Sequence, residues 1–268
     1  MVSMSSDFSI LSDNDDLPMG WELACIPEMI DIGGILSDGD WIESKDQDPE
    51  GNVRLIQLAD IGVGKYLDKS NRFLTEEKAK QLNCTFLNEG DILIARMPDP
   101  LGRACLFPSN ERKCVTVVDV CIIRSGNNGV NHRWLMHTIN SPIVRNEIEI
   151  KASGTTRQRI SKSNLSSIKL PIPPLNEQRR IVDKVEALMA RSRKAKEALD
   201  AIPKLIEQFR QSVLAAAFRG DLTADWREQN PNIEPASVLL ENNPQQKLFK
   251  EKNTNELPDP FPLPQEWV

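Results

Sequence analysis

The sequence has few of the residues on which metal sites, disulfide frameworks and membrane spans depend. It holds only two histidines, and none of its five cysteines forms a Cys-x-x-Cys pair. We therefore expect no metal site and no disulfide framework, and a cytoplasmic location is the simplest expectation. No apolar run approaches the roughly 20 residues that a membrane span needs, and the acidic start of the chain is unlike a signal peptide. Membrane and secreted classes are thus excluded.

Motifs that bind nucleotides or mark common hydrolases are also missing. There is no Walker A sequence, no Gly-x-Ser-x-Gly and no His-Glu-x-x-His, and Gly62-Val-Gly64 does not continue as a dinucleotide loop. One loose catalytic pattern is present, in which Asp99 and Glu111 would hold Mg²⁺ and Lys113 would help to activate water. Such patterns arise often by chance, and Pro98-Asp99-Pro100 also fits a turn. A magnesium-dependent nuclease is therefore kept as the alternative to the DNA-binding function considered below.

Charge is unevenly distributed along the 268 residues, whose net charge is −6. Residues 1–60 contain 2 basic and 14 acidic residues, whereas residues 61–170 contain 17 basic and 10 acidic residues. A binding surface for nucleic acid is a local property, so the acidic average does not exclude one. We expect any nucleic-acid-binding surface in the basic middle of the chain.

The pattern up to residue 170 predicts an α+β fold with a strand-rich core. Residues 1–16 are polar and aperiodic, as in a loose arm. Residues 17–170 combine short β-branched runs with turn signals and two helical stretches, one over Asn131–Asn140 and one starting at Pro142. The expected strands are Val53–Leu58, Asp91–Arg96, Arg103–Phe107 and Cys114–Arg124.

One long helix follows a proline-rich segment. Three prolines within Pro171–Pro174 favour a stiff, extended linker, and Asn176 is a good N-cap. Beyond it, apolar residues recur at alternating spacings of three and four, which is the heptad pattern of a coiled-coil helix. The stripe consists of Ile181, Val185, Leu188, Ser192, Ala195, Leu199, Ile202, Ile206, Phe209, Val213 and Ala216.

Pro203 interrupts this helix without breaking its register. A proline removes one backbone hydrogen bond, so a bend is expected there. Because the heptad spacing continues across it, we favour one kinked helix that ends at Gly220, and a helical hairpin broken at Ile202-Pro203 is the alternative. The domains are thus residues 17–170, the linker and helix over 171–222, and a C-terminal linker over 223–268.

Basic side chains gather in turn-rich segments of the strand-rich domain. No acid occurs between Ile150 and Asn176, a stretch that includes Gly154-Thr-Thr-Arg-Gln-Arg-Ile-Ser161. Flexible backbone with Arg and Gln suits contacts to phosphates and base edges, although a solvated loop has the same composition. The cluster at 191–196 on the helix fits a solvated face. The candidate DNA-binding residues are Lys65, Lys69, Arg72, Arg96, Arg103, Lys151, Arg157, Gln158, Arg159 and Lys162.

Several motifs together resemble those of a known family. Besides the turn just quoted, they are Leu170-Pro-Ile-Pro-Pro-Leu-Asn-Glu-Gln178 and Phe209-Arg-Gln-Ser-Val-Leu-Ala-Ala-Ala-Phe-Arg-Gly-Asp-Leu-Thr223. The pattern Leu-Pro-x-x-Trp also occurs twice, at Leu17–Trp21 and Leu263–Trp267, as if a second unit began at the end of the chain. The chain resembles the specificity subunit of type I restriction–modification systems.

This resemblance implies a non-catalytic reader of double-stranded DNA. In the family, two recognition domains each bind half of a bipartite site, and two long helices pack antiparallel between them. Methyltransferase subunits with S-adenosylmethionine dock on this frame, and restriction subunits that use ATP and Mg²⁺ join them, so no cofactor is expected on this chain. A pure coiled-coil scaffold without DNA contact is a third hypothesis.

The sequence departs from the family pattern because it has one recognition domain and one helix. An apolar stripe on a polar helix must be covered by another helix. We therefore predict a symmetric homodimer through Ile181–Ala216 that presents two recognition domains to a palindromic site.

Overall fold

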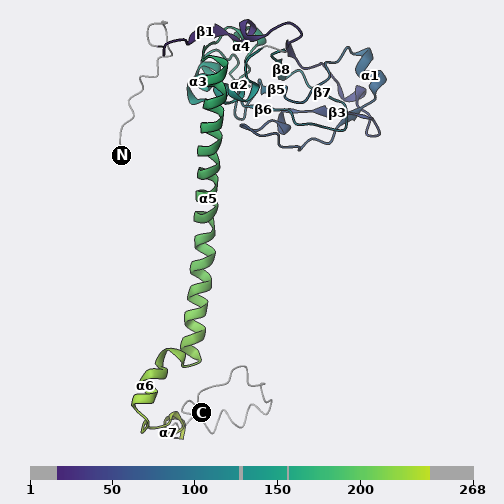
Figure 1. Ribbon diagram of the computed structural model, residues 1–268. Helices are drawn as coiled ribbons and strands as arrows, with labels where there is room; N and C mark the ends of the chain where they lie inside the picture. Colours follow the sequence, from purple (N-terminus) through teal and green to yellow (C-terminus); the bar gives the residue numbers. More distant parts are fainter. Residues whose placement is uncertain (1–16, 127–128, 156, 242–268) are drawn as a thin grey trace. The chain divides into compact units, whose positions relative to one another are not determined.

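The computed structural model describes residues 17–126, 129–155 and 157–241, and the chain divides into two compact units at Leu188 and Met189 (Figure 1). The loose arm expected at 1–16 and the second Leu-Pro-x-x-Trp motif lie outside the described residues. The first unit contains the sheets, which confirms the α+β class, and the second contains most of the long helix. Each unit is considered by itself.

A four-stranded antiparallel sheet forms the centre of the first unit. Its strand order is β2-β8-β5-β6. Strand β5 carries Ile-Leu-Ile-Ala with all four side chains buried, as expected of a short apolar run in a sheet covered on both faces. Two hydrophobic clusters use its alternate side chains, Ile92 and Ile94 in one and Leu93 and Ala95 in the other. The strands are β2 (Ile35–Asp38), β5 (Ile92–Ala95), β6 (Ala104–Leu106) and β8 (Val120–Arg124).

A second sheet of three strands has the order β4-β3-β7. Strand β3 (Val53–Ile56) lies between β4 (Phe73–Leu74), to which it is antiparallel, and β7 (Cys114–Thr116), to which it is parallel. The single strand expected over Cys114–Arg124 is therefore wrong. A turn over residues 117–119 divides the run, and its halves, β7 and β8, enter different sheets.

Short helices connect and cover the strands. The predicted helices are confirmed as α2 (His132–Ile139), capped by the Asn131 side chain, and α3 (Pro142–Ile150), capped by Ser141. Helix α2 buries Trp134, Leu135, Met136 and Ile139 against the main core. The other helices are α1 (Glu76–Gln81) and α4 (Lys162–Ser166), with short 3-10 turns at Ile26–Met29, Ser44–Asp46 and Leu58–Asp60.

The proline-rich segment belongs to the folded unit instead of forming a free linker. Strand β9 (Lys169–Ile172) pairs antiparallel with β1 (Glu22–Cys25), and Leu170 is fully buried. A proline is tolerated in β9 because this two-stranded sheet has only edge strands. Helix α5 then begins at Leu175, one residue before the predicted N-cap, and buries Gln178 and Val182 in its first turns.

Helix α5 (Leu175–Phe218) is a single helix of 44 residues that passes through Pro203. This continuity confirms one long helix and excludes the hairpin, whereas the bend at Pro203 stays a prediction. Gly220 follows with a φ of +77°, the left-handed conformation expected of a residue that ends a helix. A 3-10 turn (Asp221–Thr223), α6 (Ala224–Gln229) and α7 (Ala236–Glu241) complete the described chain.

Candidate nucleic-acid interface

The two ends of the turn over residues 153–159, of which the structure describes all residues but 156, are paired with each other. Its ends form a bridge in which the Ser153 N–H donates to the Arg159 carbonyl (3.0 Å) and the Arg159 N–H donates to the Ser153 carbonyl (2.8 Å). Gly154 has a φ of +101°, and a Cβ there would approach the Arg157 carbonyl oxygen to 2.6 Å. Only glycine fits this position without strain. Composition alone could not distinguish this segment from a solvated loop, and the structure shows that its ends are paired.

Three segments distant in sequence meet at this turn. The Ile160 N–H donates to the Arg96 carbonyl at the end of β5 (3.1 Å), and the Arg96 N–H donates to the Asp119 carbonyl in the β7–β8 turn (2.9 Å). The Arg159 guanidinium lies 3.2 Å from the Asp119 carboxylate. The base of the turn is thereby attached to the central sheet.

The candidate cations fall into two groups, because some are exposed and others are buried. Lys151 and Arg159 are half-buried, while the fully exposed members present their side chains to solvent and are available to a ligand. These exposed residues are Lys65, Lys69, Arg72, Arg157, Gln158 and Lys162.

Arg96 and Arg103 must be removed from the list of surface candidates, since they are only 3% and 6% exposed. The Arg103 guanidinium donates to four backbone carbonyls, those of Leu58, Ile61, Met97 and Pro100, at 2.5 to 3.2 Å. Burial lowers its pKa, and these acceptors compensate its charge. Arg96 pairs with Asp38 at 3.2 Å. Both residues hold loops together. One feature of the sequence could have indicated that Arg96 and Arg103 are buried. Each lies directly beside a short apolar run that forms a buried strand.

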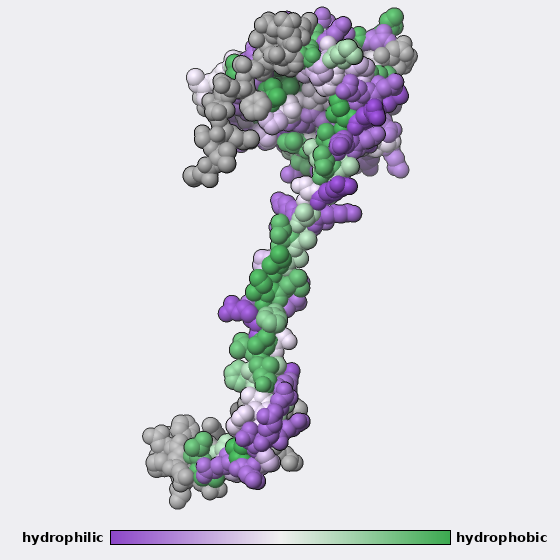
Figure 2. Space-filling view, turned by 60° about the vertical axis from the view of Figure 1, so that its left-hand side comes forward, coloured by the Kyte–Doolittle hydropathy of each residue, from purple (hydrophilic) through white to green (hydrophobic). Residues whose placement is uncertain are grey.

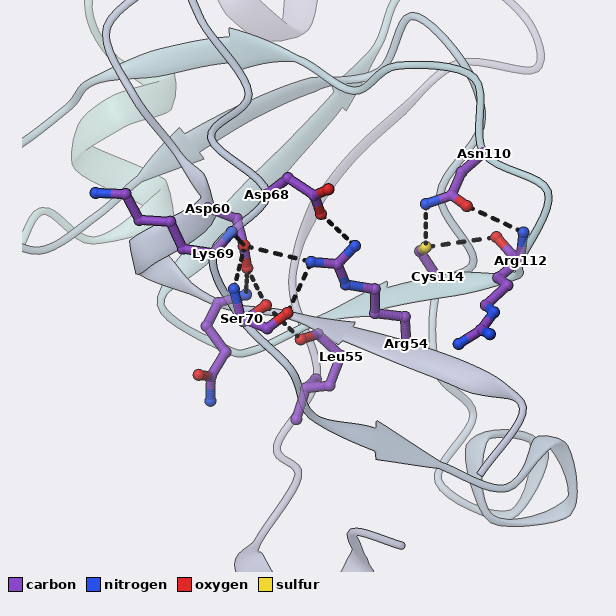
Figure 3. A network of polar contacts seen from close by, with 10 residues as sticks. Arg54, Leu55, Asp60, Asp68, Lys69, Ser70, Asn110, Arg112 and Cys114 are labelled. Atoms are coloured by element: carbon purple, nitrogen blue, oxygen red, sulfur yellow. Dashed lines mark hydrogen bonds and ion pairs between the residues drawn. The ribbon is translucent and has the colours of Figure 1, made fainter. Parts of the chain in front are cut away.

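The loop that carries Lys65 and Lys69 is organised by a buried carboxylate (Figure 3). Asp60 is fully buried, and its oxygens accept hydrogen bonds from the backbone N–H groups of Gln57, Lys69 and Ser70, each at 2.7 Å. The Ser70 hydroxyl donates to it as well. A buried charge is tolerated when it has this many donors. Sequence reasoning missed Asp60, since a single acid in a turn gives no signal.

The residues of the nuclease hypothesis have separate partners. The Asp99 charge acts on Arg103 and Arg145, whereas Lys113 pairs with Glu76 at 2.7 Å. Lys113 and Lys80 lower the pKa of the Glu76 carboxyl to about 2. Within the described ranges, no group of three or more His, Cys, Asp or Glu side chains could hold a metal ion. The structure therefore offers no support for a two-carboxylate magnesium site.

The apolar stripe of α5 is exposed over most of its length, and Figure 2 shows apolar residues gathered along this helix. Ile181 is an exception, because it packs against the main core of the first unit. Val185 and Ala216 are half-buried, and Ser192 and Ala195 are exposed. The large side chains of the stripe are exposed by 38 to 68%, and they are Leu188, Leu199, Ile202, Ile206, Phe209 and Val213. Such a stripe on a helix of 44 residues indicates a partner.

None of the helices in the described ranges combines the length and apolar character needed to cross a lipid bilayer. The first unit is strand-rich and carries a basic turn, and the long helix that follows has an exposed apolar stripe. Residues 18–203 match the family described as the type I restriction modification DNA specificity domain. The chain belongs to this family.

Similar proteins agree with this assignment. The specificity subunit of the type I restriction enzyme EcoBI from Escherichia coli is 36% identical over 213 residues, which are 78% of this chain and 43% of the relative. That of StySPI from Salmonella potsdam is 28% identical and covers 78% of this chain and 47% of the relative. The chain thus spans about half the length of these curated relatives.

Solved structures show the same fold. The HsdS subunit from Thermoanaerobacter tengcongensis aligns with 78% of this chain and 47% of its own, at 23% identity and a TM-score of 0.58. A chain from a structure titled for complex assembly and conformational transition of the type I R-M system aligns with a TM-score of 0.59 at 24% identity. The expected fold, with a strand-rich domain followed by one long helix, is confirmed.

Proposed function

We propose that this chain is a non-catalytic, sequence-specific DNA-recognition subunit of a type I restriction–modification complex. The observation that carries the proposal is the turn over residues 153–159, which presents Arg157 and Gln158 to solvent from a backbone attached to the central sheet. Arginine and glutamine are residues that read base edges and contact phosphates. Attachment of the base of the turn reduces the conformational entropy that these side chains lose when they recognise DNA.

The recognition domain reads one half-site, and the partners carry the chemistry. Methyltransferase subunits supply S-adenosylmethionine, and restriction subunits supply ATP-driven cleavage with Mg²⁺. Family membership supports this division of labour.

A second copy of the chain covers the apolar stripe of α5. Large apolar side chains of the stripe are 38 to 68% exposed, so a second helix of the same pattern can cover them. Exposed apolar side chains of this number are unfavourable on a free monomer. The homodimer presents two identical recognition domains to a palindromic site.

Side-chain sizes favour antiparallel helices in this dimer. Two small residues of the stripe, Ser192 and Ala195, lie in its first half, and a third, Ala216, lies at its end, beyond bulky Ile206 and Phe209. Antiparallel packing places small residues opposite bulky ones. Parallel packing places Ser192 on Ser192 and Phe209 on Phe209, which leaves a gap at one level and crowding at another.

A DNA-binding measurement tests the recognition function. In the double variant Arg157→Ala/Lys162→Ala, two exposed cations are removed while Arg159 keeps its contact with Asp119. The slope of log K against log salt for duplex DNA is expected to fall by about 2 in magnitude, because each lost phosphate contact contributes roughly 0.9. The matched control is Arg191→Ala/Arg193→Ala on the helix, which is expected to leave the slope unchanged. If Arg157→Ala/Lys162→Ala and the control Arg191→Ala/Arg193→Ala give equal slopes, the proposed contact between this basic segment and DNA phosphates is refuted.

A further inference from the structure

A polar pocket of about 600 Å³ lies between two loops of the first unit. Residues 68–71 and Phe73 of β4 form one wall, residues 109–112, before β7, form the other, and Arg54 of β3 also lines the pocket. Only Lys69 among its lining residues belongs to the candidates that the sequence indicated. The pocket makes no use of the turn over residues 153–159.

The wall that contains Asp68, Lys69 and Ser70 is held by a buried carboxylate and a partly buried guanidinium. Asp60 accepts the backbone N–H groups of Lys69 and Ser70 at 2.7 Å each. From the other side, the Arg54 guanidinium pairs with Asp68 and donates to the Ser70 carbonyl at 2.7 Å (Figure 3). The backbone is therefore fixed before any ligand arrives, and the side chains on the rim are the parts that remain available.

Two of those rim side chains are cations with no ion pair among the described residues, Lys69 and Arg112. The Arg112 guanidinium lies over the Phe73 ring, 5.7 Å from its centroid, so the ring limits its orientation without neutralising it. Arg54 contributes little free charge, since Asp68 pairs with it. Glu111 also lines the pocket, which leaves two unpaired cations with one carboxylate.

We propose that this pocket binds a phosphate of the DNA backbone, held by Lys69 and Arg112. The inference rests on the proposed DNA-recognition function and adds a second contact to it. Lysine, arginine, serine and asparagine side chains make most protein contacts to DNA phosphates, and Ser70, Asn71 and Asn110 line the same pocket. A phosphate neutralises the surplus of unpaired cations.

The position of the pocket fits a duplex that also reaches the basic turn. Arg112 precedes β7, and Val118, whose carbonyl contacts the Arg159 guanidinium, follows β7. Six residues separate them, so their backbones lie within about 20 Å at roughly 3.3 Å per residue. That is about the length of six base pairs at 3.4 Å each. One recognition domain can therefore contact phosphates at both places on one half-site.

Salt-dependent binding to a random-sequence duplex tests the proposal, because phosphate contacts do not depend on sequence. The variants are Lys69→Ala and Arg112→Ala in the full chain. Each is expected to reduce the magnitude of the slope of log K against log salt by about 1. The matched control is Lys80→Ala, which removes a cation of α1 whose side chain is 67% exposed and lies outside the pocket.

The outcomes separate the two proposals. The phosphate pocket alone is overturned if Lys69→Ala and Arg112→Ala both keep the wild-type slope while Arg157→Ala/Lys162→Ala lowers its magnitude. A wild-type chain that shows no binding to duplex DNA overturns the recognition function and the pocket with it. Thermal unfolding of each variant verifies folding, and these exposed substitutions are expected to change stability by less than about 0.5 kcal/mol.

Discussion

Replacing Leu199 by glutamate is expected to dissociate the proposed dimer. Leu199 is 63% exposed near the middle of the apolar stripe. Complete burial of a leucine side chain is worth about 1.5–3 kcal/mol, so covering the exposed part in both copies contributes about 2–4 kcal/mol. Losing that contribution weakens the dimer roughly thirty- to a thousandfold, since 1.36 kcal/mol corresponds to a factor of ten. Two carboxylates in an apolar interface weaken it further.

Sedimentation equilibrium measures this change directly. The wild-type chain of 30.2 kDa is expected to sediment as a dimer at micromolar concentration, and Leu199→Glu as a monomer. The matched control is Lys204→Glu, which introduces the same carboxylate on an exposed part of α5 outside the stripe. A wild-type monomer at tens of micromolar, or a Leu199→Glu variant that dimerises as tightly as wild type, would refute the role assigned to the stripe.

Further predictions concern buried ionisable groups. Asp60→Ala leaves four donors without their acceptor and is expected to lower the free energy of unfolding in urea by about 3 kcal/mol; a loss under 1 kcal/mol contradicts this. Burial raises the pKa of the Cys105 and Cys121 thiols from 9.0 to about 12 and of Cys114 to about 11. Because the unfolded thiols ionise first, their stabilising contribution is complete below pH 9 and is lost as the pH rises toward 11–12. Between pH 8 and pH 10.5, the free energy of unfolding in urea is expected to fall less in Cys121→Ala than in wild type. An equal fall in both proteins contradicts this.

Local patterns predicted three of the helices, α2, α3 and α5. The heptad spacing identified α5 across Pro203, and Pro142 at a first helical position marked the start of α3. These features depend on residues a few positions apart, which a sequence displays directly. The same reasoning placed β3, β5 and β6 to within two residues at each end.

Features that depend on long-range contacts were not predictable in this way. The run Cys114–Arg124 gives no local sign that its halves enter different sheets. The prolines of 171–174 suggested a stiff, extended linker, because nothing near them reveals the pairing of β9 with β1. Arg103 looks like a surface cation until the carbonyls of Leu58 and Ile61 are brought to it by the fold. Tertiary contacts, which no short window contains, decide these cases.

The most direct test of the central claim is to co-express this chain with its methyltransferase subunits and map the methylated sites. We expect methylation at one bipartite, palindromic DNA sequence, since two identical recognition domains read its halves. The double variant Arg157→Ala/Gln158→Ala is expected to abolish or alter that sequence, whereas Arg191→Ala/Arg193→Ala is expected to preserve it. Methylated sites that are the same with and without this chain would contradict the account.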